Sequence, residues 1–213
     1  MHSRRVFVGP TMTNTKLSIS FIAIGLICCA MCENSSEIVC PRVVGRGEWN
    51  ASDSTEINFL ELPVKIAIIC HTASPECWSL DTCKRRVKSF QRYHQREKHF
   101  GDIAYNFLIG NDGNVYEGIG WYQIGRHTKN YNEKSVGIAF IGNFTDKLPS
   151  QVALDSAKSL LVCGRSKQYL DENYSLFGAR DISRTESPGA KLNEEIQNWP
   201  HWMAVDQGQI IFV

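Results

Sequence analysis

The pattern of apolar positions predicts a strand and then a helix in the first part of the chain. A dense run of Ile and Val over Pro63–Cys70 is typical of a strand that is buried on both faces. Over Leu80–His99, side chains suited to a core recur every three or four residues, which predicts an amphipathic helix. The predicted stripe of this helix is Cys83, Val87, Phe90 and His94, and Gly101-Asp102 is expected to end it.

The later part of the chain continues this alternation. Ile103–Ile109 and Asn114–Glu117 flank Gly110-Asn111-Asp112-Gly113, which predicts a hairpin through an Asp-Gly turn, and Ser135–Ile141 is a further strand. A helix is expected to open at Pro149-Ser150 and stop at Gly164, and a last helix is closed by Pro200. The sequence therefore predicts a single α/β domain with a central mixed β-sheet flanked by helices. The expected apolar stripes are Ala153, Ala157, Leu160 and Leu161, then Leu192, Ile196 and Trp199.

Composition narrows the class of protein. The chain has 213 residues, of which 43% are apolar, and this is enough for one good-sized domain with a packed core. Disordered, collagen-like and coiled-coil proteins are excluded on the same grounds. The 23 Lys and Arg residues nearly balance the 22 Asp and Glu residues, so the chain lacks the charge of a general nucleic-acid binder.

The first 32 residues have the layout of a secretory signal peptide. Arg4, Arg5 and Lys16 precede the apolar run Leu17–Met31, and cleavage is expected after Cys32. The alternative is an N-terminal membrane anchor, but the run is shorter than the roughly 20 residues that span a bilayer. We therefore expect a secreted mature chain, residues 33–213, with no membrane span. Its net charge becomes −2, from 20 basic and 22 acidic residues.

Cysteines and glycosylation motifs agree with an oxidising, extracellular setting. Removal of the signal peptide leaves five cysteines, so at least one is unpaired within the chain. Cys77 and Cys83 are close in sequence and favour a small disulfide loop. The motifs for N-glycosylation are Asn34, Asn50, Asn143 and Asn173.

Residue chemistry alone indicates no established catalytic site. His94 and His99 are five residues apart and do not share a helical face, and HExxH, paired CxxC and GxSxG motifs are absent. Cys70 and His71 are neighbours on a strand and therefore point to opposite faces, which argues against a Cys–His nucleophile pair. The residues by themselves indicate a secreted α/β domain with a cluster of polar and aromatic side chains.

Several longer stretches occur together, in one order and spacing, over about Cys40 to Trp202. They are IICHTA at 68–73, DIAYNFLIGNDG at 102–113, VYEGIGW at 115–121, His127-Thr128, Tyr131-Asn132, GIAFIGNF at 137–144, TESPG at 185–189 and WPHW at 199–202. In these stretches the chain resembles the peptidoglycan recognition protein family, most of all its short secreted insect members. The resemblance implies an amidase-like fold. It also implies a disulfide between Cys40 and Cys163, beside Cys77–Cys83, which leaves Cys70 as the free thiol.

The resemblance also bears on catalysis. Active members of the family are zinc-dependent amidases that hold the metal with two histidines and a cysteine. At these positions the chain has Cys70, Ala179 and Ser187, although it keeps the tyrosine of active members as Tyr105. Alanine has no donor atom and a serine hydroxyl is a poor zinc ligand, so a site with three protein ligands is missing. We predict that the protein is not an enzyme and uses no cofactor.

What the resemblance leaves is a binding groove for bacterial peptidoglycan. Members that prefer diaminopimelate-type stem peptides tend to have arginine at the position of Ile119 and Gly-Trp at that of His99-Phe100, so we expect a preference for lysine-type peptidoglycan. The implied role is an innate immune receptor upstream of Toll-type signalling, with a protein co-receptor or protease cascade as a further partner. The alternatives are a residual amidase and an immune regulator that acts mainly through protein partners. The expected ligand contacts are His71, Thr72, His94, Phe100, Tyr105, Ile119, His127 and Asn132.

Overall fold

One mixed β-sheet is the centre of the computed structural model, which describes residues 9 and 40–205. Within these residues the strand order is β1-β4-β3-β5-β2-β6, and all neighbours are parallel except the β3–β4 hairpin. The predicted α/β class with a mixed sheet is therefore confirmed. The strands are β1 Val43–Val44, β2 Val64–His71, β3 Phe107–Ile109, β4 Val115–Glu117, β5 Ser135–Phe140 and β6 Leu170–Gly178.

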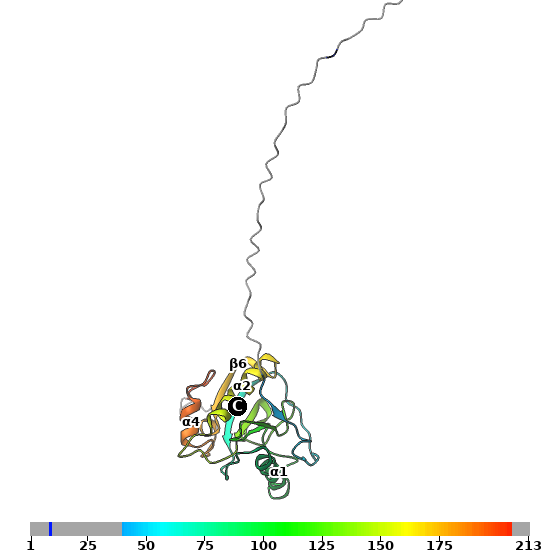
Figure 1. Ribbon diagram of the computed structural model, residues 1–213, viewed down its shortest axis with the longest axis vertical. Coiled ribbons are helices and arrows are strands. Elements are labelled where there is room, and N and C mark those ends of the chain that lie inside the picture. The colour runs from blue at the N-terminus through cyan, green and yellow to red at the C-terminus, as the bar shows by residue number, and fades with distance from the viewer. Residues whose placement is uncertain (1–8, 10–39, 206–213) are drawn as a thin grey trace, which may run out of the picture. The chain divides into compact units, whose positions relative to one another are not determined.

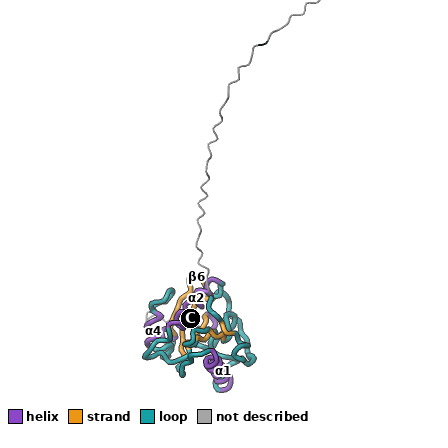
Figure 2. The backbone as a smooth tube through the Cα atoms, viewed as in Figure 1, coloured by secondary structure: helices purple, strands orange, loops and turns teal. Residues whose placement is uncertain are grey.

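Helices pack on both faces of this sheet (Figure 1). Core residues of α2 and α4 pack with one face, and core residues of α1 and α3 pack with the other. Figure 2 shows that long loops connect these elements around the outside of the domain. The helices are α1 Leu80–Arg96, α2 Gln151–Ser166, α3 Ala179–Ile182 and α4 Ala190–Ile196, with a short 3-10 turn at Asn132–Lys134.

Strand β2 has buried side chains on both faces of the sheet, so helices are needed on both sides. Its successive side chains point to opposite sides, so Ala67 and Ile69 belong to the core under α2, whereas Ile68 and Cys70 belong to the core under α1. All four side chains are almost completely buried. The dense apolar run in the sequence therefore has the two-sided burial that it predicts.

Helix α1 begins where the sequence provides a cap. The Ser79 hydroxyl accepts a hydrogen bond from the Thr82 N–H, and the Thr82 side chain accepts one from the Ser79 N–H. The helix ends at Arg96, earlier than predicted, because His99 already has a left-handed backbone with φ of 56°. Gln91, a polar residue that the stripe did not include, is fully buried, while Phe90 is only half-buried.

Three other boundaries differ from the prediction. The segment 103–106 is not a strand, because the Ala104 N–H donates to the His94 ring and the Ala104 carbonyl accepts from Arg126. Gly164 does not stop α2, since the helix continues to Ser166 with the Trp121 ring against this glycine. The last helix ends at Ile196, so Trp199 lies beyond it, still buried.

Two disulfides fasten the outer segments of the domain. Cys40–Cys163, the long bridge, joins residues 123 positions apart, and Cys77–Cys83, the short bridge, ties the segment before α1 to the first turn of this helix. Both predicted pairings are confirmed, and Cys70 is a buried free thiol. Within residues 40–205, no helix is long and apolar enough to cross a membrane. The predicted signal peptide, its cleavage site after Cys32 and the Asn34 motif lie outside the described residues.

Candidate functional site

The candidate site begins at the carboxyl end of β2. His71 ends this strand and is 7% exposed, and its ring Nδ1 accepts a hydrogen bond of 3.3 Å from the Phe144 N–H. Burial lowers the pKa of His71, so the ring is neutral and its Nε2 carries the proton as a donor. The Thr72 hydroxyl accepts from the Gly142 N–H at 3.0 Å. The loop after β5 therefore holds both side chains in place.

A ring cluster beside α1 brings together three of the expected contacts. The His94 ring stacks with Phe100 at a centroid distance of 5.9 Å and meets the edge of Tyr105 at 5.7 Å. His94 Nδ1 accepts from the Ala104 N–H at 3.1 Å, and burial lowers the pKa of His94 to about 4. A neutral histidine with one nitrogen engaged keeps its other nitrogen as a hydrogen-bond donor.

His127 is held by a different part of the chain. Its ring lies against Gly137 of β5, so closely that a Cβ at Gly137 would collide with it. His127 Nδ1 lies 3.2 Å from the Thr128 hydroxyl, and the Thr128 N–H donates to Asn132 Oδ1 at 2.8 Å. His127 Nε2 is buried and has no hydrogen-bond partner among the described residues. Such an unpartnered buried atom is unusual in a folded protein.

Cys70, Ala179 and Ser187, the positions that the resemblance predicts for zinc ligands, lie close to the end of β2. Ser187 contacts the Cys70 thiol, and its Oγ accepts a hydrogen bond of 3.0 Å from the His71 N–H, across 116 residues of sequence. Ala179 follows Gly178, which is in register with Ile69 of β2, and belongs to the same buried cluster as Cys70. Tyr105 also lies near Cys70: burial is the main cause that raises the Tyr105 pKa, and the charge that Cys70 would carry on ionisation is a second cause.

These residues do not fit a zinc ion. The Ala179 side chain has no donor atom, and the Ser187 hydroxyl oxygen already accepts a hydrogen bond. Burial raises the pKa of Cys70 to about 12, so in the metal-free protein this group is a neutral thiol. Among the described residues there is no group of three or more His, Cys, Asp or Glu side chains that could hold a metal ion.

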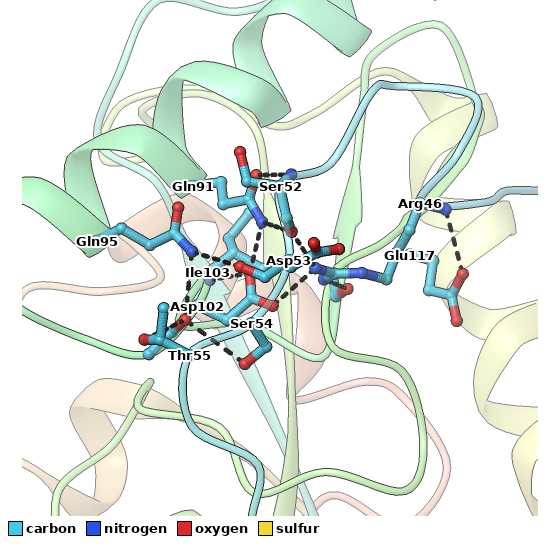
Figure 3. A network of polar contacts seen from close by, with 12 residues as sticks. Arg46, Ser52, Asp53, Ser54, Thr55, Gln91, Gln95, Asp102, Ile103 and Glu117 are labelled. Atoms are coloured by element: carbon cyan, nitrogen blue, oxygen red, sulfur yellow. Dashed lines mark hydrogen bonds and ion pairs between the residues drawn. The ribbon is translucent and has the colours of Figure 1, made fainter.

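A polar network around Asp102 connects the segment before Tyr105 with helix α1 and with Arg46 (Figure 3). The Asp102 carboxylate is 8% exposed and accepts from Arg46 Nη2 at 2.7 Å, Gln91 Nε2 at 2.7 Å and the Ile103 N–H at 2.6 Å. Arg46 Nη1 also donates to the Gly118 carbonyl, next to Ile119. The ion pair between Arg46 and Asp102, together with its hydrogen bonds, thus connects the N-terminal segment, helix α1 and both loops that surround Tyr105.

The eight expected contacts fall into connected groups rather than one cavity. His71 and Thr72 share the loop after β5, and the Ile119 N–H donates to the Tyr105 carbonyl at 3.2 Å. Ile119 and Asn132 line a cavity of about 330 Å³, to which the other six expected contacts do not contribute. The described glycosylation motifs Asn50, Asn143 and Asn173 are all exposed.

Sequence reasoning missed the residues that support the site from behind. Asn106 is fully buried, and its side chain donates to the Gly120 and Gln123 carbonyls and accepts from the Gly137 N–H. An asparagine inside an apolar run was the available signal, since a buried amide needs partners. No local pattern pairs Asp102 with Arg46, which lies 56 residues away.

Comparison with known proteins agrees with this geometry. The family model described as N-acetylmuramoyl-L-alanine amidase matches residues 60–190. Peptidoglycan-recognition protein SA of Drosophila melanogaster is 47% identical over 165 residues, which cover 78% of this chain and 81% of the relative. The chain belongs to the peptidoglycan recognition protein family. The resemblance in the sequence motifs is thereby confirmed.

Solved structures of family members share this fold. The bumblebee protein PGRP-SA matches with a TM-score of 0.77 and 44% identity, covering 78% of this chain and all of that chain. A peptidoglycan recognition protein LE, solved in complex with tracheal cytotoxin, a monomeric diaminopimelic acid-type peptidoglycan, matches with a TM-score of 0.76 and 40% identity, over 76% of this chain and 96% of that one. The amidase-like fold of this family member is therefore established on both sequence and structure.

Proposed function

We propose that the protein is a secreted receptor that binds bacterial peptidoglycan and does not cleave it. The observation that carries the proposal is the site around Cys70. Hydrogen-bonding groups suited to a muramyl peptide surround it, whereas the donor set for zinc is gone at Cys70, Ala179 and Ser187. A relative solved with a peptidoglycan fragment supports the choice of ligand.

The chemistry of the groove suits an amide-rich sugar peptide. Three histidines are neutral because burial lowers their pKa, and each has one ring nitrogen that is not used in the hydrogen bonds described above: His71, His94 and His127. The Tyr105 hydroxyl stays protonated because burial raises its pKa. These groups can donate to lactyl, amide and carboxylate oxygens, while aromatic rings such as Phe100 pack on sugar and alkyl parts.

Binding and metal content are best measured on one sample. Purified mature protein is mixed with insoluble lysine-type peptidoglycan, and the bound fraction, the zinc per chain and the released stem peptide are quantified. We expect binding, far less than one zinc per chain and no release. Zinc near one per chain together with released stem peptide would show a residual amidase, and failure to bind peptidoglycan would favour a regulator that acts through protein partners.

Two variants locate the site. Thr72→Val and His127→Gln each remove one expected ligand hydrogen bond, and at about 1 kcal/mol each the pair should weaken muropeptide binding about tenfold or more. His201→Asn is the matched control, because His201 lies beyond β6, stacked on Tyr174, and its φ of 68° suits asparagine. Equal affinity of the double variant and the control would contradict the proposed groove.

We further propose a preference for lysine-type stem peptides. Ile119 is 7% exposed, and its aliphatic side chain offers no charged partner to the additional carboxylate of diaminopimelate. Calorimetry with matched muropeptides should show tighter binding of the lysine type, and Ile119→Arg should narrow or invert the ratio. Equal affinities for wild-type protein would refute the preference. The variant can lose stability at this buried position, so the ratio of the two affinities is the measurement that counts.

The place of action follows the same proposal. A cleaved signal peptide, residues 1–32, would put the receptor in the extracellular space, upstream of Toll-type signalling through a protein co-receptor or protease cascade. The insect relatives are named peptidoglycan-recognition proteins, which agrees with a receptor role. Mass spectrometry of protein secreted by insect cells should give a mature N-terminus at Glu33, and retention of the apolar run in membranes would argue for an anchor instead.

A further inference from the structure

A second cavity lies beside the candidate groove, on the α3 side of the domain. Its volume is about 810 Å³, within the range of pockets that bind small organic ligands and well above that of a lone ion. Lys129 follows Thr128, which contacts the Cys70 thiol, and Arg180 follows Ala179. Two of the lining residues are therefore next in sequence to residues near Cys70. Its lining is Lys129, Asn130, Arg180, Asp181, Ile182, Ser183, Arg184, Trp202, Ala204 and Val205.

The charges in this lining are uneven. Lys129 and Arg184 form no ion pair with any residue in the described part of the chain, and Arg180 meets only the exposed Glu186, at 4.0 Å. A surface pair at that distance contributes little. Three cationic side chains thus gather in a mature chain whose net charge is −2.

The acidic residue in the lining is already engaged. Asp181 Oδ2 accepts from the Gly178 N–H at 2.9 Å, and its Oδ1 accepts from the Asn193 side chain at 2.9 Å. Asp181 therefore fastens α3 to the rest of the domain and does not neutralise a lining cation through a direct ion pair. With this one carboxylate included, the lining still carries an excess of two positive charges.

Trp202 adds a second, independent observation. Its indole Nε1 is buried and has no hydrogen-bond partner among the described residues. A buried indole N–H normally finds an acceptor. The lining also contains the apolar side chains of Ile182 and Val205, and Asn130 contributes an amide. An aromatic ring, an amide and guanidinium groups in one cavity suit a sugar ring that bears an oxyanion, since arginine binds carboxylate and phosphate through two parallel hydrogen bonds.

We propose that this cavity, the α3 pocket, is a second binding site that takes a sugar carrying a carboxylate or a phosphate. It is separate from the groove, and its cations bind the oxyanion while Trp202 contacts the sugar. A carboxylate and a phosphate both bind cationic side chains, so the experiment includes one sugar of each kind.

The test titrates the mature protein with N-acetylglucosamine 6-phosphate, glucuronic acid and neutral N-acetylglucosamine, by calorimetry and tryptophan fluorescence. We expect at least one of the two acids to bind tenfold or more tighter than the neutral sugar, with an affinity that falls several-fold as salt rises. The acid that binds identifies the source of the oxyanion. If neither acid binds better than the neutral sugar, the proposal is wrong.

Variants assign the binding to the pocket. Lys129→Ala with Arg184→Ala should weaken acid binding tenfold or more, whereas Arg85→Ala with Arg92→Ala, an equal change of charge on the exposed side of α1, should not. An equal loss in both pairs would mean a general charge effect and overturn the proposal. Trp202→Phe should abolish the fluorescence change on binding, and persistence of that change would exclude Trp202 as a contact.

The same samples separate this inference from the proposed function. The Lys129 and Arg184 double variant should bind a lysine-type muropeptide as the wild type does, because neither residue belongs to the groove. Muropeptide binding without acid binding would overturn the α3 pocket and leave the receptor function standing. Acid binding without muropeptide binding would overturn the receptor function and leave the α3 pocket standing.

Discussion

Replacement of Asp102 by asparagine tests whether the buried ion pair fixes the loop that carries the ring cluster. Removal of one partner of a buried pair costs about 3–5 kcal/mol. The Arg46 side chain is 25% exposed and regains some water, so we expect a loss of about 2–3 kcal/mol in the free energy of unfolding, discounted for that exposure. For a domain of this size the loss lowers Tm by roughly 5–10 °C.

Urea unfolding with both disulfides intact measures the effect. The control is Glu48→Gln, which removes an ion pair with Arg42 whose side chains are 63% and 45% exposed, and this should cost less than about 1 kcal/mol. Arg46→Met combined with Asp102→Asn should lose less than the sum of the two single changes, because the single changes each leave one charge unpaired. An Asp102→Asn variant within about 0.5 kcal/mol of the wild type would refute the reasoning.

Three further outcomes follow from the structure. Gly137→Ala places a methyl group in the His127 ring and should weaken muropeptide binding tenfold or more, whereas Gly47→Ala, with open space around it, should not. Loss of the long bridge should lower the free energy of unfolding by about 4–5 kcal/mol, and loss of the short bridge by about 2 kcal/mol, because the longer closed loop restricts the unfolded chain more. Equal losses in variants that replace the cysteines of one bridge with serine would contradict this explanation. Because burial lowers the pKa of His94 to about 4, the unfolded chain binds its proton first, so stability should fall as the pH drops from about 6.5 to about 4. In urea unfolding at a series of pH values, His94→Gln should remove up to about 3 kcal/mol of this pH-dependent loss of unfolding free energy. If the variant loses stability with pH as steeply as the wild type, His94 is not the source of the loss.

Local patterns predicted those elements that neighbouring residues control. The two-sided burial of β2, the Asp112-Gly113 turn and the capped start of α1 depend on side chains within a few positions of one another. Strand β6 was missed because its run of Asp, Glu and Asn lacks an apolar pattern, and it forms a strand through its pairing with β2. Tertiary contacts also moved the end of α1 and removed the expected strand at 103–106.

The sequence by itself determined the chemical identity of the candidate site. At Cys70, Ala179 and Ser187, the positions that the resemblance predicts for zinc ligands, the residue types alone provide too few donor atoms for zinc. Only the tertiary structure decided that these residues meet, that a His127 nitrogen has no partner within residues 40–205, and that cations gather in the α3 pocket. The physical reason is that sequence periodicity reports contacts over three or four residues, whereas the site depends on sheet register between segments more than 100 residues apart.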